Sequence, residues 1–477
     1  MKNKDKKIEP IAVVLLAAGL GKRMRSDLPK VLISTDGRAM IEYVIDEALT
    51  LNPERLVIVT GHKRELVESL LFKNYPDQCA SKNLRFAFQS EQKGTGDAVR
   101  AALPELEGFV GSIIIVCGDT PLITSETLKG LLEVHRNEHA TISLISVETR
   151  DPAQYGRIIR AENGHVSTIR EFKDCSATER LIHEINSGVY VVDSSFLPGA
   201  LSKLENNNAQ GEFYLTDIVG QAASEGQTIS CLRHFNLSEL QGINNRIDLV
   251  EASRLLRERR IMALIEAGVD IQNPATVEVA RTAQIAAGVS IGAHTQILGD
   301  TTIGTGCVIE GFSVLADCKI AERTIIHQFV HASKATIGAD SHIGPFARLR
   351  EGTVLAGENR IGNFVETKKT SFEKGVKANH LSYLGDCLIG EASNIGAGTI
   401  TCNYDGYKKS TTTIGKNVFI GSNSSLVAPV SIGDGATVAA GSVITKNVES
   451  DALGVTRAEQ KTVSGWSKNK RAKNSSM

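Results

Sequence analysis

In the second half of the chain, branched aliphatic residues recur at every sixth position. The period runs through residues 291–315, 337–361, 389–395 and 414–444, and glycine often follows the aliphatic residue, as in IGAHT, IGTGC and IGDGA. An α-helix cannot keep a period of six on one face. A hexapeptide β-helix can, because each six residues form one short strand and a turn. The pattern therefore predicts a left-handed parallel β-helix whose repeated aliphatic side chains stack into a continuous core.

The period is interrupted at three places, between residues 315 and 337, 367 and 389, and 395 and 414. Because these spacings are not multiples of six, we expect insertions that loop out of the coil. Binding residues often lie on such excursions from a rigid frame. The last interruption contains TCNYDG, a polar turn with one aromatic residue.

The first half of the chain alternates strand-like and helical segments. The strand-like segments are short, rich in β-branched residues and mostly closed by turn residues: IAVVLLAAG, ERLVIVTG, LRFAFQ, GSIIIVCGD and ATISLISVET. Residues 40–51 and 63–71 carry apolar positions at helical spacing. This alternation predicts an α/β domain with a mostly parallel, Rossmann-like sheet. Ligands in such sheets bind beyond the carboxyl ends of strands, where the glycine turn at 19–21 and the CGD at 117–119 lie.

A helical pattern joins the two halves. It covers residues 247–268, and Gly268 is a plausible stop. One stripe of this helix is apolar: Leu249, Ala252 and Leu256. We therefore expect three parts: an α/β domain at 1–246, a helical linker at 247–268, and a β-helix domain at 269–477.

Composition limits the kinds of partner. The formal net charge is −1, so no broad electrostatic field recruits nucleic acid or an anionic membrane. The eight cysteines are scattered without a CxxC pair, which favours reduced thiols in a cytoplasmic protein over a zinc site or a disulfide framework. No apolar run reaches the length of a membrane span.

The two ends of the chain are basic. MKNKDKK followed by IAVVLLAAG has the outline of a signal peptide, but Pro10 interrupts it and no small-residue cleavage site follows. We expect instead a buried first strand after a frayed N-terminal tail. The C-terminal WSKNKRAKNSSM is predicted to be a solvated, disordered end.

The stretch VVLLAAGLGKRMRSDLPKVL, residues 13–32, combines a glycine turn with concentrated positive charge. It is neither a P-loop nor a dinucleotide fingerprint, because Met24 stands in the place of the third glycine. The glycines alone would favour an ordinary strand-to-helix turn. Four closely spaced cations favour a polyphosphate ligand instead: Lys22, Arg23, Arg25 and Lys30.

This stretch resembles the signature of the sugar-phosphate nucleotidyltransferases, although Lys22 stands where many members carry Thr. QSEQKGTGDAV, VCGDTPL, YGRIIR, EINSGVY and GINNR follow in the family's order. With the hexapeptide half, nearly the whole chain resembles the bifunctional bacterial enzymes that join N-acetylglucosamine-1-phosphate uridylyltransferase to glucosamine-1-phosphate N-acetyltransferase.

For the first half, the resemblance implies uridylyl transfer from UTP to N-acetylglucosamine 1-phosphate with release of pyrophosphate. Arg23 and Lys30 would stabilise the triphosphate, and Asp119 with Asn244 would hold Mg²⁺. A phosphate oxygen is already anionic at neutral pH, so no general base is needed. The resemblance also implies a nucleotide and sugar site, with Gln89, Gly94 and Thr95 at the uracil and Gly156, Glu171 and Asn186 at the sugar. Its residues are Leu16, Ala17, Ala18, Gly19, Gln89, Gly94, Thr95, Gly156, Glu171, Asn186 and Asn244.

For the second half, the resemblance implies acetyl transfer from acetyl-CoA to glucosamine 1-phosphate. The sugar amine must lose a proton, and the motif selects His380 as the base over His294, His327 and His331. Glu366 would orient or charge-balance His380. Arg350 and Lys368 resemble a clamp for the sugar phosphate. Further sugar and acetyl-CoA contacts are implied at Tyr383, Asn394, Ala397, Asn403, Tyr404, Ser422, Ala440 and Arg457.

The resemblance further implies a parallel homotrimer with the acyl-transfer site between subunits, and a role in supplying peptidoglycan and lipopolysaccharide precursors. Two alternatives remain open at this point. One is a non-catalytic scaffold or regulatory protein that keeps the same two-domain plan. The other is an enzyme with one activity, such as a glucose-1-phosphate nucleotidyltransferase with a structural β-helix.

Overall fold

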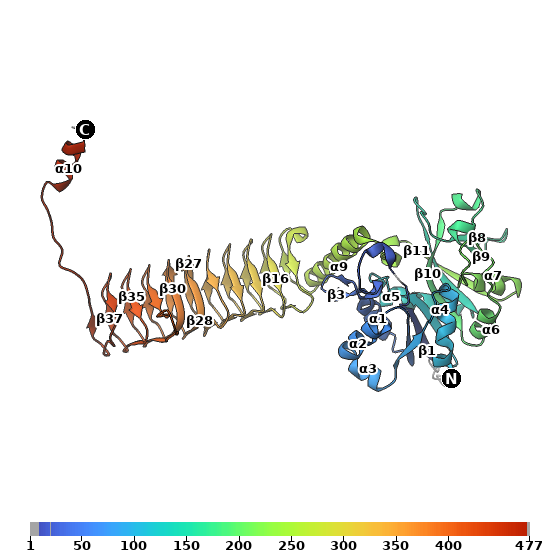
Figure 1. Ribbon diagram of the computed structural model, residues 1–477, viewed down its shortest axis with the longest axis horizontal. Coiled ribbons are helices and arrows are strands. Elements are labelled where there is room, and N and C mark those ends of the chain that lie inside the picture. Colours follow the sequence, from blue (N-terminus) through green and yellow to red (C-terminus); the bar gives the residue numbers. More distant parts are fainter. Residues whose placement is uncertain (1–8, 20, 475–477) are drawn as a thin grey trace, which may run out of the picture. The chain divides into compact units, whose positions relative to one another are not determined.

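The computed structural model describes residues 9–19 and 21–474, apart from the side chains of Lys22 and Lys473. The basic N-terminal tail predicted from MKNKDKK lies outside the described residues. The chain forms two compact units, divided in sequence between Leu256 and Arg257. Both are shown in Figure 1.

The first unit is built on a mixed sheet with the strand order β11-β7-β10-β6-β1-β4-β5, to which the β8–β9 hairpin is added. All the strands expected from the sequence form, with β1 at Ile11–Leu16, β4 at Arg55–Thr60 and β6 at Ser112–Cys117. Strand β1 runs parallel to both β4 and β6, whereas β10 (Glu184–Asp193) is antiparallel to its neighbours. The remaining strands are β5 (Leu84–Phe88), β7 (Ile142–Glu148), β8 (Arg157–Arg160), β9 (Val166–Arg170) and β11 (Ile229–His234).

Helices cover both faces of this sheet because successive strand residues point to opposite sides. In β1, Val13 and Leu15 join one core with helices α1, α2 and α5, and Ala12 and Val14 join a second core with α4, α6 and α7. These helices are α1 (Met40–Leu49), α2 (Arg64–Asn74), α4 (Thr95–Ala102), α5 (Ser125–Asn137), α6 (Leu197–Ser202) and α7 (Asp217–Ser224). The buried first strand predicted from the sequence is confirmed.

The second unit is a parallel β-helix of very short strands, from β12 (Asp270–Ile271) to β39 (Leu453–Gly454). One ladder of eleven strands forms one side of the coil, and a sheet of seventeen strands curls around the rest. The hexad residues form one continuous core, as in Ile291, Ile309 and Ile326, which follow one another up the first ladder. Small residues beside the core close the corners. Thr295, for example, donates its hydroxyl to the carbonyl of Gly292 at 2.7 Å.

Two of the three predicted insertions are wrong. Between residues 315 and 337, and again between 367 and 389, the coil continues without a loop. In each stretch, two sides of the coil contain five residues rather than six. In the first stretch the buried positions are therefore Leu315, Ile320, Ile326, Ala332 and Ile337. The pairing still holds, because shortening by one residue at a corner leaves the inward positions aligned.

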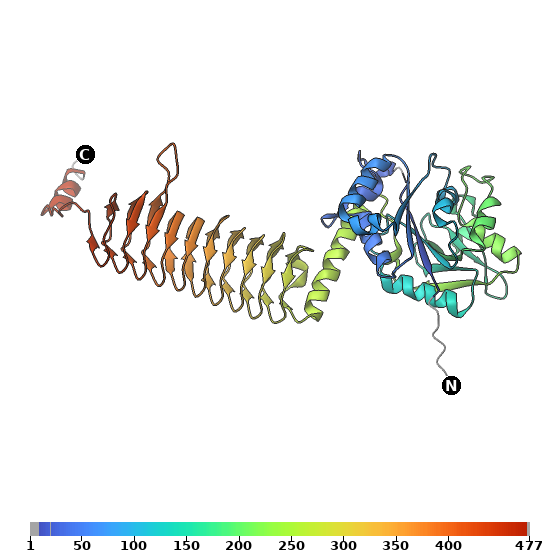
Figure 2. The ribbon, with the colours of Figure 1, turned by 90° about the horizontal axis from the view of Figure 1, so that it is seen from below.

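The third insertion is confirmed. Residues 403–411 leave the coil and project from it, as Figure 2 shows. On the far side the ladder resumes in register, with Cys387 paired to Thr412 and Ile389 to Ile414.

Helix α9 (Arg246–Glu266) confirms the predicted connecting helix, but it belongs to both units. Leu249, Ala252 and Leu256 enter a core cluster of the first unit, and Ile261 enters the core of the second. The C-terminal end also differs from expectation, since Trp466–Asn474 form helix α10. None of the helices in the described part of the chain has the length and hydrophobicity of a membrane span.

Candidate active sites

The glycine turn after β1 brings a lysine against the backbone. Gly21 has a φ of 60°, and a Cβ added there would lie 2.7 Å from the Cβ of Lys30. Both the left-handed backbone and this close approach require glycine. The turn therefore places Lys30, the first residue of the 3₁₀ helix η2 (Lys30–Leu32), beside the carboxyl end of β1.

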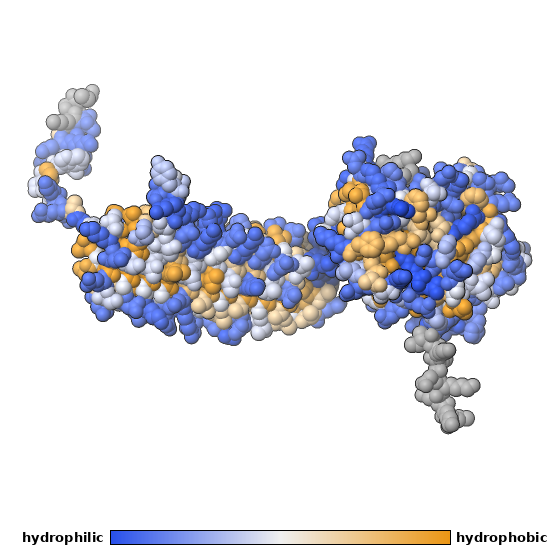
Figure 3. Space-filling view, turned by 60° about the horizontal axis from the view of Figure 1, so that its bottom comes forward, coloured by the Kyte–Doolittle hydropathy of each residue, from blue (hydrophilic) through white to orange (hydrophobic). Residues whose placement is uncertain are grey.

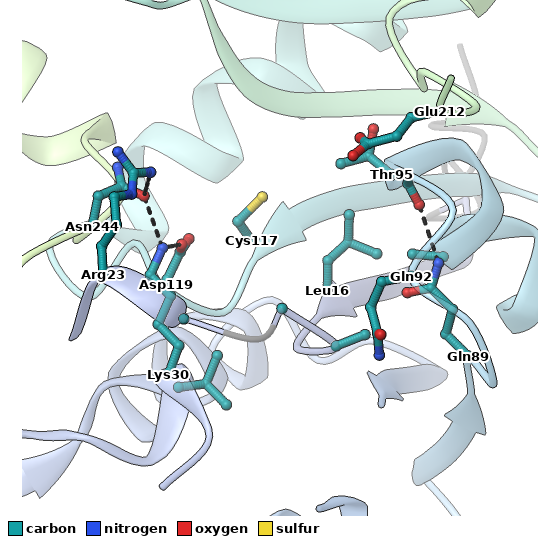
Figure 4. Close-up of a pocket in the computed structure, with 16 residues that line it drawn as sticks. Leu16, Arg23, Lys30, Gln89, Gln92, Thr95, Cys117, Asp119, Glu212 and Asn244 are labelled. Carbon is teal, nitrogen blue, oxygen red and sulfur yellow. Dashed lines mark hydrogen bonds and ion pairs between the residues drawn. The ribbon is translucent and has the colours of Figure 1, made fainter. Parts of the chain in front are cut away.

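Two cations and two oxygen-bearing side chains converge at this edge of the sheet. The Lys30 ammonium forms an ion pair with Asp119 just beyond β6, and it donates to Asn244 Oδ1 at 3.0 Å. Arg23 donates to the same oxygen at 3.2 Å. Figure 4 shows these four side chains at one end of a cavity.

Backbone contacts fix the direction of the Asn244 amide. Its Nδ2 donates to the carbonyl of Gly242 at 3.0 Å, so Oδ1 faces the cations. The backbone N–H of Asn244 donates to Asp248 at 2.8 Å, and that of Ile243 donates to the carbonyl of Asp119 at 2.9 Å. The loop before α9 is therefore bonded directly to the end of β6.

The oxygens of Asp119 and Asn244 fit a magnesium ion that is also bound by substrate. They converge on one cation-sized position, because the Lys30 ammonium contacts both. No group of three His, Cys, Asp or Glu side chains suited to a metal occurs in the part of the chain that the structure describes. A hard cation held by few protein oxygens and completed by phosphate oxygens is the arrangement that Mg²⁺ prefers.

The cavity continues from this charged end toward the start of α4. Its volume is about 380 Å³. Gln89 follows β5, and Gly94 and Thr95 begin α4. A Cβ on Gly94 would lie 2.5 Å from the carbonyl oxygen of Phe213, so only glycine fits there. Ten predicted residues line the cavity: Leu16, Ala18, Gly19, Arg23, Lys30, Gln89, Gly94, Thr95, Asp119 and Asn244.

Four predicted residues do not line this cavity. The side chain of Ala17 lies in the core, and its amide donates to the carbonyl of Val59. Gly156, Glu171 and Asn186 lie together elsewhere in the same unit. The backbone N–H of Asn186 donates to the carbonyl of Gly156 at 2.9 Å, and a Cβ on Gly156 would be 3.6 Å from Glu171 Oε1.

Glu171 lines a second hollow, which shares Arg23 with the cavity. Burial raises the pKa of the Glu171 carboxyl, and a hydrogen bond from Thr216 at 3.2 Å opposes this shift. A hollow with a neutral or anionic oxygen, amides and a shared arginine suits a hydroxylated phosphate ester. Its lining residues are Arg23, Gln154, Glu171, Phe172, Lys173 and Gln210.

Gly21, which belongs to the predicted glycine turn, also lines the main cavity, and sequence reasoning missed five other lining residues: Val31, Gln92, Ala98, Cys117 and Glu212. Gln92 and Cys117 lie inside the motifs QSEQKGTGDAV and VCGDTPL, whereas Glu212 comes from a distant segment that only the tertiary fold brings close. Burial raises the pKa of the Cys117 thiol to about 12, so the group is not a nucleophile near neutral pH.

A second cluster lies on the β-helix, where two neighbouring strands meet the projecting loop. Glu366 in β28 (Glu366–Phe372) pairs with Tyr383 in β30 (Tyr383–Ile389), and Lys368 pairs with Gly385. The ring of Tyr383 covers Gly385, where an added Cβ would lie 2.5 Å from the Tyr383 hydroxyl. Asn403, at the start of the projecting loop, donates to Asp386 in β30.

Cations gather beside this cluster. The pKa of Lys368 is lowered, first by the neighbouring amine of Lys409 and then by the positive charge of Arg350. Three cations this close together, of which Lys409 is exposed and the other two are half-buried, favour an anionic ligand. Sequence reasoning missed Lys409, although it lies in the loop that was predicted as an excursion.

The expected role of Glu366 beside His380 stays a prediction. Glu366 Oε1 accepts a hydrogen bond from Arg350 at 2.8 Å. His380 does not lie on an excursion, because it ends strand β29 (Lys377–His380) within the coil and is paired with Asn363. Its side chain is exposed, and no hydrogen bond reaches the imidazole from any residue that the structure describes.

The other predicted acetyl-CoA contacts follow one corner of the coil. The amide of Asn423 donates to the carbonyl of Ala397 at 2.7 Å, and that of Gly441 donates to the carbonyl of Ser422 at 2.7 Å. Ala440 and Arg457 continue this column, since an added Cβ on Gly421 would lie 2.4 Å from the amide of Ala440, and one on Gly441 would lie 4.0 Å from Arg457 Cδ. Asn394 lies on β31 (Asn394–Ile395), and Tyr404 lies on the projecting loop.

Known proteins resemble this chain in both of its halves. Residues 13–186 match the MobA-like NTP transferase domain, residues 411–446 the hexapeptide repeat of succinyl-transferase, and residues 273–369 the GMPPB C-terminal domain. The chain is 44% identical to the bifunctional protein GlmU of Geotalea uraniireducens, over 96% of this chain and 98% of that protein. It is also 44% identical to the proteins of that name from Sorangium cellulosum and Cellvibrio japonicus, over 96% and 95% of this chain and 96% and 98% of those proteins.

Proposed function

The chain belongs to the family of bifunctional GlmU proteins, and from this premise we propose that it catalyses two group transfers at two separate sites. The second unit transfers acetyl from acetyl-CoA to glucosamine 1-phosphate. The first unit then transfers uridylyl from UTP to N-acetylglucosamine 1-phosphate and releases pyrophosphate. The observation that carries the proposal is the convergence of Arg23, Lys30, Asp119 and Asn244 in one cavity.

In uridylyl transfer, an oxygen of the sugar phosphate attacks the α-phosphorus of UTP, and the bond to the β-phosphate oxygen breaks. The nucleophile is already anionic, so the obstacle is repulsion between anions. Arg23 and Lys30 oppose this repulsion and stabilise the charge that develops on pyrophosphate. Gln89, Gly94 and Thr95 hold the uracil, and Gly156, Glu171 and Asn186 hold the sugar.

We assign a magnesium ion to Asp119 and Asn244, where it would neutralise charge on phosphate oxygens. Lys30 is paired with Asp119 in this structure. Its flexible four-carbon stem allows the ammonium to contact phosphate when the Asp119 carboxylate is otherwise engaged.

In acetyl transfer, the sugar nitrogen attacks the thioester carbonyl carbon and the carbon–sulfur bond breaks, which releases CoA. His380 takes the proton that the nitrogen must lose. Arg350, Lys368 and Lys409 bind the sugar phosphate, supported by the lowered pKa of Lys368. The corner column of Ala397, Ser422, Ala440 and Arg457 holds acetyl-CoA.

We further propose that the protein acts as a homotrimer. Its support is the hexapeptide coil and an exposed ladder of stacked rings along the coil, with centroids 4.7–5.3 Å apart. The ladder consists of His294, Phe312, Phe329, Phe346 and Phe364. Figure 3 shows apolar residues at intervals on the coil surface. A mass three times that of one chain, measured by light scattering, tests this proposal.

The eight cysteines are unpaired, which supports a reducing, cytoplasmic location. There the product would feed peptidoglycan and lipopolysaccharide precursors. The test of the two-reaction proposal is a pair of separate assays on the purified protein. If neither UDP-sugar nor acetylated sugar phosphate forms, the protein is a scaffold. If only UDP-sugar forms and His380→Ala leaves that activity intact, the protein has one activity.

A further inference from the structure

Gln89 is held by two acceptors at the base end of the cavity. Its Nε2 donates to the carbonyl of Gly94 at 3.1 Å and to Asp97 Oδ2 at 2.9 Å. The residue is 4% exposed, so these bonds are shielded from water. Neither a carbonyl nor a carboxylate oxygen can donate a hydrogen bond in return.

The two acceptors fix which way the amide points. If the amide turned over, its oxygen would face Asp97 and the Gly94 carbonyl, and both hydrogen bonds would be replaced by repulsion. Gln89 Oε1 consequently faces the cavity, as Figure 4 shows, and no hydrogen bond from the described part of the chain reaches it. The cavity therefore offers a hydrogen-bond acceptor at this point.

Asp97 is itself anchored. It lies in the first turn of α4, where a negative charge is favoured, and its Oδ1 lies 3.8 Å from Arg100 Nη1. Arg100 donates to the carbonyl of Leu201 at 2.8 Å and lies over the ring of Phe213 at 4.8 Å. The carboxylate is thus held in place by contacts that do not involve Gln89.

We propose that Asp97 is a positioning residue that fixes the Gln89 amide with its oxygen toward the cavity, and that this polarity selects a nucleobase presenting an N–H donor. The inference rests on the proposed uridylyl transfer, because it concerns the base of that nucleotide. Uracil carries an N–H at N3. Cytosine carries an unprotonated nitrogen at the same position, so two acceptors would face each other.

The experiment compares UTP with CTP in the full-length protein. kcat and KM for nucleotide-sugar formation are measured for the wild type, Asp97→Ala and the isosteric Asp97→Asn, whose side chain can either accept from or donate to the Gln89 amide. Binding of UTP and of CTP is measured by calorimetry in parallel, so the comparison does not depend on turnover. Glu126→Ala is the matched control, because Glu126 is an exposed acid in the first turn of α5, outside the cavity lining.

We expect the preference for UTP over CTP to fall at least about tenfold in Asp97→Ala and by a smaller factor in Asp97→Asn. The change should appear in KM and in the binding constant rather than in kcat, since the base is remote from the reacting phosphorus. Glu126→Ala should keep the wild-type preference. An equal loss for both nucleotides, with the preference unchanged, would show that Asp97 only supports the helix.

The two proposals fail differently. If the wild type forms no nucleotide sugar and binds neither nucleotide, both the uridylyl transfer and the role of Asp97 are wrong. If the wild type forms UDP-sugar and the Asp97 variants keep its base preference, only the positioning role is wrong.

Discussion

Replacing Lys30 by methionine removes one positive charge from the cavity and keeps most of the side-chain volume. The Lys30 side chain is 12% exposed and that of Asp119 is 22% exposed, so water screens their charges only partly. Two unit charges about 4 Å apart interact by about 2–4 kcal/mol at an effective dielectric constant of about 20–40. If Lys30 makes such a contact with the leaving pyrophosphate, Lys30→Met should lower kcat/KM for uridylyl transfer about 30- to 1,000-fold.

The assay follows pyrophosphate release and, separately, thiol release from acetyl-CoA in the same preparation. Acetyl transfer should change less than twofold, because its residues lie in the other compact unit with its own core. Lys129→Met is the matched control, since it removes the same charge from an exposed position on α5. Equal losses of both activities in a folded protein, or a loss no larger than that of Lys129→Met, would show that Lys30 does not stabilise the transferring phosphate.

Four further outcomes are expected. His380→Ala should lower acetyl transfer at least about 100-fold and leave uridylyl transfer unchanged, as the two assays would show. Gly21→Ala should cost about 1–2 kcal/mol from its left-handed backbone and reduce uridylyl transfer as the turn shifts from Lys30; urea unfolding and the same assay check both effects. Removal of divalent cations with EDTA should abolish uridylyl transfer, with recovery on adding Mg²⁺, while acetyl transfer persists. The raised pKa of Glu171 means that the folded state favours its protonated form, so burial of the carboxylate destabilises the protein as pH rises. The melting temperature of the wild type should therefore fall relative to that of Glu171→Gln as the pH rises above about 4.5, the ordinary pKa of glutamate, and a constant difference would contradict this assignment.

The spacing of apolar residues predicted the folds of both units, because apolar residues at regular positions are the ones that become buried. The six-residue repeat identified the coil, and alternating apolar segments identified the sheet and its helices. The same periodicity misled at residues 315–337 and 367–389, because a side shortened by one residue breaks the count without breaking the stack. Only the pairing of neighbouring strands distinguishes a shortened side from a loop.

The candidate sites were predicted where function lies in a local motif. Gly21 and Lys30 are close in sequence, and their contact follows from the turn. Glu212 reaches the cavity from a distant segment that no local pattern marks, whereas Lys409 lies in the predicted loop but outside the motif that was quoted from it. The hydrogen bond from Arg350 to Glu366 could not be predicted locally either, because the arginine lies one coil away.

The loop at residues 403–411 has a consequence for how this coil tolerates change. Thr370 and Ser371 pair with Cys387 and Leu388 one turn on, and those residues pair with Thr412 and Thr413 across the loop. Foreign peptide of other lengths could be grafted at this corner, because the strands on either side align through their neighbours and not through the connecting segment. The paired strands thus stabilise the coil, and the loop carries side chains for binding. The loop can therefore vary, by evolution or by design, without a change in the coil.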